Sequence, residues 1–442
     1  MTRAKSHSPI PRFGNWQRPT PRFLSIRWLI LATCVLAIPP ARAEFSRHRG
    51  KHLELITDLD DPRRADDLVA SFDAAVPQWA AFWQLRPAAV RGWQVVAYVM
   101  QDPERFRRAG HIPDRLPDFR FGYALGDRVW VIAQPSDYYT RHLLLHEGVH
   151  SLAFSQFGGA GPTWFMEGTA EFLSTHVGAG ETIRVGAVPA SRQAVPYWGR
   201  FKLMSDRREQ GQIPSLQTVM RLAPQASGDP EAYGWSWAAA MLLHHYPDTW
   251  PAFRAAARHG RDPSATFTRR LYQRLQSRWP LVVARWRIHA HDLDYGFDWE
   301  RERVDLSMGD PLWDARPLDF TVQADRGWQS PGVRFAAGTK LTIAAEGRCV
   351  VAETTKPWVS EPPGVTIRYH RGRPLGQLLV AEVPCHTPDR PTLPPLSVRG
   401  YEEARSWQTE EDCWLLFRVN DDVGELADNR DGYDVRVRAA RP

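Results

Sequence analysis

The sequence predicts a mixed α+β domain followed by an all-β sandwich domain, and three observations support this fold class. The chain has 442 residues, 43% hydrophobic and 24% charged, a globular balance with length for two or three domains. Its first part mixes short strand patterns with long helical ones. From Phe320 onward, short strands punctuated by Gly, Pro and Asp replace the helices. We place the two domains at residues 44–304 and 305–442.

Residues 1–43 are predicted to be a secretory signal peptide. A basic stretch precedes the apolar run WLILATCVLAI, and Ala41-Arg42-Ala43 supplies an A-x-A cleavage site. The run is too short to span a bilayer comfortably, and no other stretch of the sequence could do so. We expect export to the periplasm or the medium after cleavage near Ala43, or membrane anchoring if the segment stays uncleaved.

Removing residues 1–43 changes both the charge and the cysteine count. The formal net charge is +6, but this segment holds seven basic and no acidic residues, which leaves 49 of the 56 basic residues against all 50 acidic ones. A nucleic-acid partner is therefore not expected. Three cysteines remain for an oxidising compartment, Cys349, Cys385 and Cys413, and the sequence does not choose a pair among them.

The elements of the first domain follow from hydrophobic periodicity. The pattern predicts strands over residues 52–59, 93–100, 120–125 and 129–133, helices over 62–86, 138–157 and 163–176, and a largely helical region from 196 to 291. The segment WSWAAAMLLHHY at 235–246 is nearly all apolar, so we expect it to be buried. Residues 301–318 are charged and irregular, and they precede the strands of the second domain.

The helix over 138–157 carries the motif that indicates chemistry, HEGVH, with histidines at 146 and 150. Positions i and i+4 share one face of a helix, so His146 and His150 can bind one Zn²⁺, and Glu147 can hold the water bound to it. The alternative is a helix with two core or surface histidines. Apolar residues at helical spacing favour a helix packed on a core. Gly148 is unusual, because a glycine inside a helix costs about 1 kcal/mol relative to alanine.

A catalytic zinc site needs a third ligand, and Glu167 is the candidate. A third histidine six residues after the second is excluded, because Gln156 stands there. Glycines at 158, 159 and 161 permit a sharp reversal into the next helix, so two helices can pack side by side and bring Glu167 to the metal. Glu171 lies one turn further on the same face, where it can accept a hydrogen bond from a ligating imidazole.

HEGVH followed by WFMEGTAEF resembles the gluzincins, most closely the peptidase-MA-like and aminopeptidase-type HExxH…E metallopeptidases. The resemblance covers roughly residues 50–290 in the order of elements. It implies a zincin-like fold, zinc held by His146, His150 and Glu167, and the central glutamate of the motif as general base. In that family a downstream tyrosine stabilises the oxyanion, and Tyr233 resembles it in placement. The G-x-M-E-N segment that recognises a free amino terminus is absent, which puts aminopeptidase specificity in doubt.

The second domain carries clustered acid and amide side chains on a loop between two strands. Asp421, Asp428 and Asn429 offer the oxygen ligands that Ca²⁺ prefers, whereas a turn with Asx caps explains the same residues without a metal. This stretch, with RPLGQLLVAEV at 373–383, resembles the calcium-dependent galactose-binding lectin fold of bacteria. The calcium loop of that fold maps onto these three residues, with Asp428 in place of an asparagine, and implies a glycan or cell-surface ligand.

Three functions are compatible with these motifs. The leading interpretation is an exported zinc metallopeptidase that acts on a peptide or protein substrate, with the strand over 128–133 as the expected place for an extended substrate to pair. The alternatives are a catalytically inactive, peptidase-like binding protein whose β-sandwich recognises a glycan, and a zinc hydrolase of a non-peptide amide. The complete set of motif residues favours an active site, since a decayed enzyme is free to lose any of them.

Overall fold

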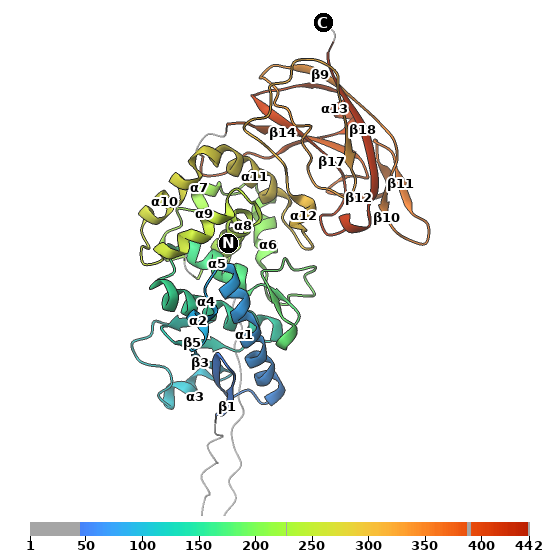
Figure 1. The fold of residues 1–442 in the computed structure, drawn as a ribbon. Helices are drawn as coiled ribbons and strands as arrows, with labels where there is room; N and C mark the ends of the chain where they lie inside the picture. The colour runs from blue at the N-terminus through green and yellow to red at the C-terminus, as the bar shows by residue number, and fades with distance from the viewer. Residues whose placement is uncertain (1–44, 227, 387–389, 441–442) are drawn as a thin grey trace, which may run out of the picture. The chain divides into compact units, whose positions relative to one another are not determined.

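The computed structural model of the chain describes residues 45–226, 228–386 and 390–440 (Figure 1). The signal peptide predicted over 1–43 lies outside the described residues. The fold is mixed α+β, as expected, with most of its strands in the C-terminal region. In the part of the chain that is described, no helix combines the length and the apolar character needed to cross a bilayer.

The N-terminal region is built on a five-stranded sheet in the order β1-β2-β3-β5-β4. Strands β2, β3 and β5 are parallel, and the edge strands β1 and β4 are antiparallel to their neighbours. The strands are β1 Ser46–Arg49, β2 Leu53–Thr57, β3 Val95–Met100, β4 Gly122–Leu125 and β5 Arg128–Ile132. Alternate side chains of the strands face opposite sides: Val99 and Val131 join the main core, whereas Tyr98 and Trp130 join a smaller one.

The sheet order corrects one expectation from the sequence. The strand predicted to pair with substrate, β5, is hydrogen-bonded on both sides, to β3 and to β4. It therefore has no free edge, and an extended peptide cannot add to it. Among the described strands, β4 is the edge next to β5, and it contacts the helix that carries the HEGVH motif.

Helices pack on the sheet and on one another. The 21-residue helices α1 (Pro62–Phe82) and α4 (Asp137–Phe157) share the main core with the sheet. Gly148 of α4 permits this packing, because a Cβ there would stand 2.4 Å from Cε2 of Phe72 and 3.0 Å from Cη2 of Trp79, both on α1. The glycine that weakens the helix locally thus lets two helices approach closely.

A short reversal joins α4 to α5 (Thr163–Ser174). Gly158 caps α4 with φ 72° and Gly161 has φ 80°, both in the left-handed region that glycine adopts without strain. Helix α5 packs against both α4 and the apolar helix α8 (Pro230–His245). The remaining helices of this region are α2 Pro87–Val90, α3 Pro103–Arg108, α6 Arg200–Glu209, α7 Leu216–Val219, α9 Trp250–Ala256, α10 Ala265–Leu275, α11 Trp279–Asp292 and α12 Trp299–Glu302, with the short strands β6 His176–Val177 and β7 Arg184–Val185.

The C-terminal region consists of antiparallel sheets around one hydrophobic core. The larger sheet has the order β11-β10-β18-β9-β16, with β8 also paired to β18, and the smaller has the order β15-β14-β17. Both contribute to one core, for example Val435 from β18 and Phe417 from β17. The strands are β8 Leu318–Gln323, β9 Lys340–Glu346, β10 Cys349–Ala352, β11 Trp358–Ser360, β12 Val365–His370, β13 Arg373–Leu375, β14 Leu378–Pro384, β15 Ser397–Gly400, β16 Ser406–Gln408, β17 Cys413–Val419 and β18 Arg430–Ala439, with one short helix, α13 Tyr401–Ala404.

No disulfide joins the described cysteines. Cys349 and Cys413 are buried in the core between the sheets, and Cys385 packs against a separate cluster.

Candidate metal centre

The structure brings together the three residues that the sequence predicts as zinc ligands. His146 and His150 lie one turn apart on α4, and Glu167 faces them from α5. Oε2 of Glu167 lies 3.2 Å from Nε2 of His146 and 3.5 Å from Nε2 of His150, and the two Nε2 atoms are 3.1 Å apart. The three ligand atoms lie within 4.8 Å of one another, and all three side chains are buried.

The electrostatics of this trio favour a positive charge at its centre. Burial alone would lower the pKa of His146, but hydrogen bonds with Glu167 and Glu171 outweigh it and raise that pKa to about 10. Burial likewise opposes ionisation of Glu167, yet hydrogen bonds from His146 and His150 hold its pKa well below the usual range. A buried carboxylate that stays ionised beside two imidazoles is a donor set suited to a divalent cation.

Glu147 projects toward the edge strand of the sheet. A Cβ placed on Gly122, the first residue of β4, would stand 2.7 Å from Oε1 of Glu147, so the carboxylate lies directly against this backbone. Glu147 is 8% exposed. Burial raises its pKa above the ordinary glutamate value, against the opposing effect of the two histidines of the motif. A carboxylate with a raised pKa is a better proton acceptor near neutral pH.

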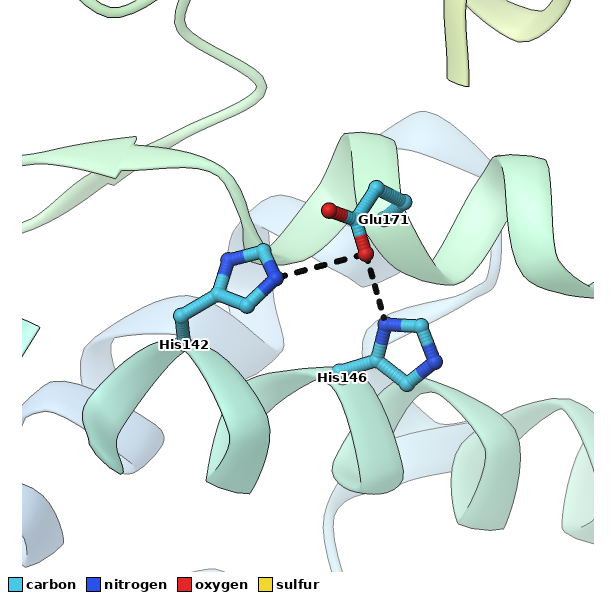
Figure 2. Close-up of side chains that lie close together, drawn as sticks. All are labelled: His142, His146 and Glu171. Atoms are coloured by element: carbon cyan, nitrogen blue, oxygen red, sulfur yellow. Dashed lines mark ion pairs between the residues drawn. The ribbon is translucent and has the colours of Figure 1, made fainter. Parts of the chain in front are cut away.

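Glu171 supports His146 from the other side of the ring (Figure 2). Its Oε2 lies 3.3 Å from Nδ1 of His146 and 3.3 Å from Nε2 of His142, one turn earlier on α4. Its Oε1 accepts hydrogen bonds from Nε1 of Trp198 and Nε of Arg200, each at 2.8 Å. Each ring nitrogen of His146 therefore faces a different carboxylate. Nδ1 can donate to Glu171, which leaves Nε2 to face Glu167 and His150.

A second trio, His142, His146 and Glu171, also brings three potential ligand atoms within 4.8 Å (Figure 2). It is a poor cation site, because N–H groups and the positive charge of Arg200 already satisfy Glu171. Burial also lowers the pKa of His142, although Glu171 opposes this effect. Of the two trios, His146, His150 and Glu167 is therefore the better candidate for a metal position.

Tyr233, near the start of α8, lies beside His146. The two rings are almost parallel, with centroids 5.7 Å apart and an interplanar angle of 18°. The Tyr233 hydroxyl accepts a hydrogen bond from the backbone N–H of Gly228 at 2.9 Å. The residue is thus at the site, with its ring against His146 and its hydroxyl on the turn before α8.

Two site residues were not expected from the sequence. They are Trp198 and Arg200. Both belong to the segment PYWGR at 196–200, which leads into α6. No motif spacing links this segment to the HEGVH helix, and only the fold brings it to Glu171. A tryptophan and an arginine beside a glycine are too common to signal such a contact.

In the C-terminal region, two of the three predicted calcium ligands meet. Nδ2 of Asn429 donates to Oδ2 of Asp421 at 2.9 Å, and both side chains are buried. Burial raises the pKa of Asp421 to about 6, and Oδ1 of Asn429 is buried without a hydrogen-bond partner among the described residues. The Asp428 carboxylate has a different partner, because its Oδ2 accepts from the backbone N–H of Glu353 at 2.8 Å.

Comparisons with known proteins add little to this geometry. No family model matches the chain, and no curated protein matches its sequence. Among solved structures, the chain is similar to one described as "EclA N-terminal domain; PllA-like lectin", at 17% identity, over 28% of this chain and 96% of that chain. The TM-score is 0.21, and a similarity this low carries no functional argument.

Proposed function

We propose that this chain is a zinc-dependent hydrolase of peptide bonds with a zincin-like N-terminal region. The observation that carries the proposal is the convergence of His146, His150 and Glu167, with Glu147 between the two histidines in sequence and buried beside them. Two imidazoles and one carboxylate, with a glutamate adjacent, are the composition of a catalytic zinc site.

The residues present fit a zinc ion by their chemistry. Three potential ligand atoms lie within 4.8 Å of one another, and the Glu167 carboxylate supplies negative charge for a divalent cation. Zn²⁺ held there would supply a Lewis acid that acidifies water and polarises a carbonyl group. Three protein ligands are also the number found in catalytic zinc sites, which keep one position for water or substrate.

The chain's own residues then account for proton transfer and positioning. Glu147 accepts the proton of the attacking water at its carboxylate and returns it to the nitrogen of the leaving amine. Its raised pKa suits both steps, because the group must take and release a proton near neutral pH. Tyr233 would assist by donating its hydroxyl proton to the oxyanion, because the hydrogen bond from the Gly228 N–H uses only the hydroxyl oxygen as acceptor.

The edge strand β4 indicates how a peptide substrate would bind. Strand β4 begins at Gly122, against the Glu147 carboxylate, and among the described strands its outer edge is unpaired. An extended peptide could add to β4 by backbone hydrogen bonds, which would carry its carbonyl groups past Glu147. This arrangement favours peptide bonds over isolated small amides as substrate.

The test is a Glu147→Gln variant assayed on an unfolded protein substrate. We expect turnover to fall by a factor of about 100 or more, because the proton acceptor is removed, while zinc content stays at one per chain. Glu382→Gln is the matched control, since Glu382 is equally buried, at 8% exposure, but lies in the C-terminal region. Wild-type protein that binds zinc but cleaves no peptide would contradict the proposal and favour the inactive binding protein.

A second function, calcium-dependent recognition by the C-terminal region, is favoured by one observation. Oδ1 of Asn429 is buried without a partner among the described residues, and Nδ2 of the same side chain donates to the buried Asp421 carboxylate. Buried acceptors in this state are costly unless a cation or water satisfies them. We propose Ca²⁺ there, with a glycan as the class of ligand.

Calorimetric titration with CaCl₂ tests this second function. We expect wild-type protein to bind one Ca²⁺ and Asp421→Asn to lose binding at least tenfold, because the charged ligand is removed. Asp434→Asn serves as control, since Asp434 lies on the sheet and bonds Thr321 instead. Absence of a calcium signal in the wild type would leave the Asx-turn interpretation of this loop.

A further inference from the structure

We propose that Arg200, with Trp198, is a positioning residue for the metal centre: the two side chains fix Glu171, and Glu171 in turn fixes the metal ligand His146. This inference rests on the metal site of the proposed function, but it concerns residues that neither the motif nor the family resemblance assigns. Its readout is metal affinity, so it can be tested separately from peptide hydrolysis.

The two oxygens of the Glu171 carboxylate have different partners. Arg200 donates from Nε to Oε1 at 2.8 Å and from an Nη to Oε2 at 3.4 Å, and Trp198 donates to Oε1 at 2.8 Å. With Oε1 held by two donors, the carboxylate cannot rotate freely. Oε2 is thereby directed at Nδ1 of His146, 3.3 Å away.

The Arg200 guanidinium also compensates the buried charge of Glu171. Glu171 has no exposed side-chain surface, and the Arg200 side chain is only 6% exposed. A buried carboxylate needs a partner charge and several hydrogen bonds to remain an acceptor. The planar guanidinium supplies both, with two donors in a fixed geometry that lysine cannot reproduce.

Arg200 also reaches His146 through the ring of Tyr233. Its Cζ lies 5.5 Å from the centroid of the Tyr233 ring, and that ring is nearly parallel to His146. Arg200 therefore contacts two of the groups that define the orientation of the His146 ring, Glu171 on the Nδ1 side and Tyr233 against the ring face. A single residue at the start of α6 thus couples both supports.

The experiment measures Zn²⁺ affinity by competition with a chromophoric chelator. We expect Arg200→Met to weaken Zn²⁺ binding by about 10- to 100-fold, the usual cost of losing the outer support of a metal ligand. Trp198→Phe, which removes one donor and keeps most of the volume, should lose less, about threefold to tenfold. Arg141→Met is the matched control, because Arg141 is a buried, ion-paired arginine of α4 that bonds Asp67 rather than Glu171.

Cobalt substitution and a conservative variant separate positioning from folding and from charge. We expect the visible absorption bands of Co²⁺ to change in Arg200→Met and to stay unchanged in Arg141→Met, because only the first alters ligand orientation. Arg200→Lys keeps the charge but loses the paired donors, so its Zn²⁺ affinity should fall between the Met variant and the wild type.

Two results would overturn the inference. One is a Zn²⁺ affinity and Co²⁺ spectrum in the Arg200 and Trp198 variants equal to those of the wild type. The other is tighter binding in Arg200→Met, which would mean that the arginine charge only repels the metal. If Arg200→Met does not fold, Trp198→Phe decides by the same two measurements. A wild-type protein that binds zinc but hydrolyses no peptide would contradict the proposed function and would leave this inference standing.

Discussion

Glu147 and Gly122 meet where the motif helix passes the edge of the sheet. A Cβ at position 122 would stand 2.7 Å from Oε1 and 2.9 Å from Cγ of Glu147, closer than such atoms approach. Gly122→Ala should therefore displace the Glu147 side chain while leaving His146, His150 and Glu167 in place. We expect turnover to fall about 10-fold or more with zinc affinity unchanged, measured by steady-state kinetics and chelator competition.

Gly92→Ala is the control for that variant, because a Cβ at position 92 meets no atom within 4 Å. Equal turnover in Gly122→Ala and wild type would show that Glu147 moves aside without cost. The carboxylate position against β4 would then not matter for the reaction.

Among the helices and strands, the sequence best predicts those whose signals lie within one short stretch of the chain. Helices α4 and α5 begin and end within about two residues of the predicted bounds, because periodicity, glycine reversal and motif spacing all lie within one short stretch. The same stretch contains the trio His146, His150 and Glu167. Two adjacent helices bring the three residues together, whereas Glu171, which contacts His146, is held by Trp198 and Arg200 from a separate segment.

The parts that the sequence could not predict depend on distant pairing. The order β3-β5-β4 places β5 inside the sheet, and the apolar run of β5, although typical of an interior strand, does not by itself say which strands pair with it. The PYWGR segment reaches Glu171 only through the packing of α5, α6 and α8. The close packing that explains Gly148 likewise needs Phe72, far away in sequence. Long-range packing decides these features, and one sequence does not encode it in a readable pattern.

At the scale of the whole molecule, buried charges join the helices to the C-terminal strands. Arg418 of β17 lies 3.2 Å from Asp292 at the end of α11 and 3.4 Å from Glu302 at the end of α12. Trp328 also donates to Asp292, at 2.6 Å. All four side chains are buried, so a buried network of polar and charged side chains connects the C-terminal region to the helices.

Of the two carboxylates in this network, Glu302 has the weaker charge compensation. Its pKa predicts that the stability of the protein depends on pH. Burial raises its pKa to about 7, despite the opposing charge of Arg418, whereas the ordinary value is 4.5. Because the folded state holds this proton more tightly, the contribution of Glu302 to stability is present at low pH and is lost as the pH rises from about 4.5 to 7.

The Glu302→Gln variant isolates that contribution, since the amide it introduces cannot ionise and all other titrating groups are shared with the wild type. The free energy of unfolding of the variant minus that of the wild type should rise by about 1–3 kcal/mol between pH 5 and pH 7.5. Urea denaturation of both proteins with a chelator present measures this difference without metal binding. A difference that is constant with pH would show that Glu302 is already ionised at pH 5 as the ion-pair partner of Arg418, and the network would then bind the two regions through two full ion pairs.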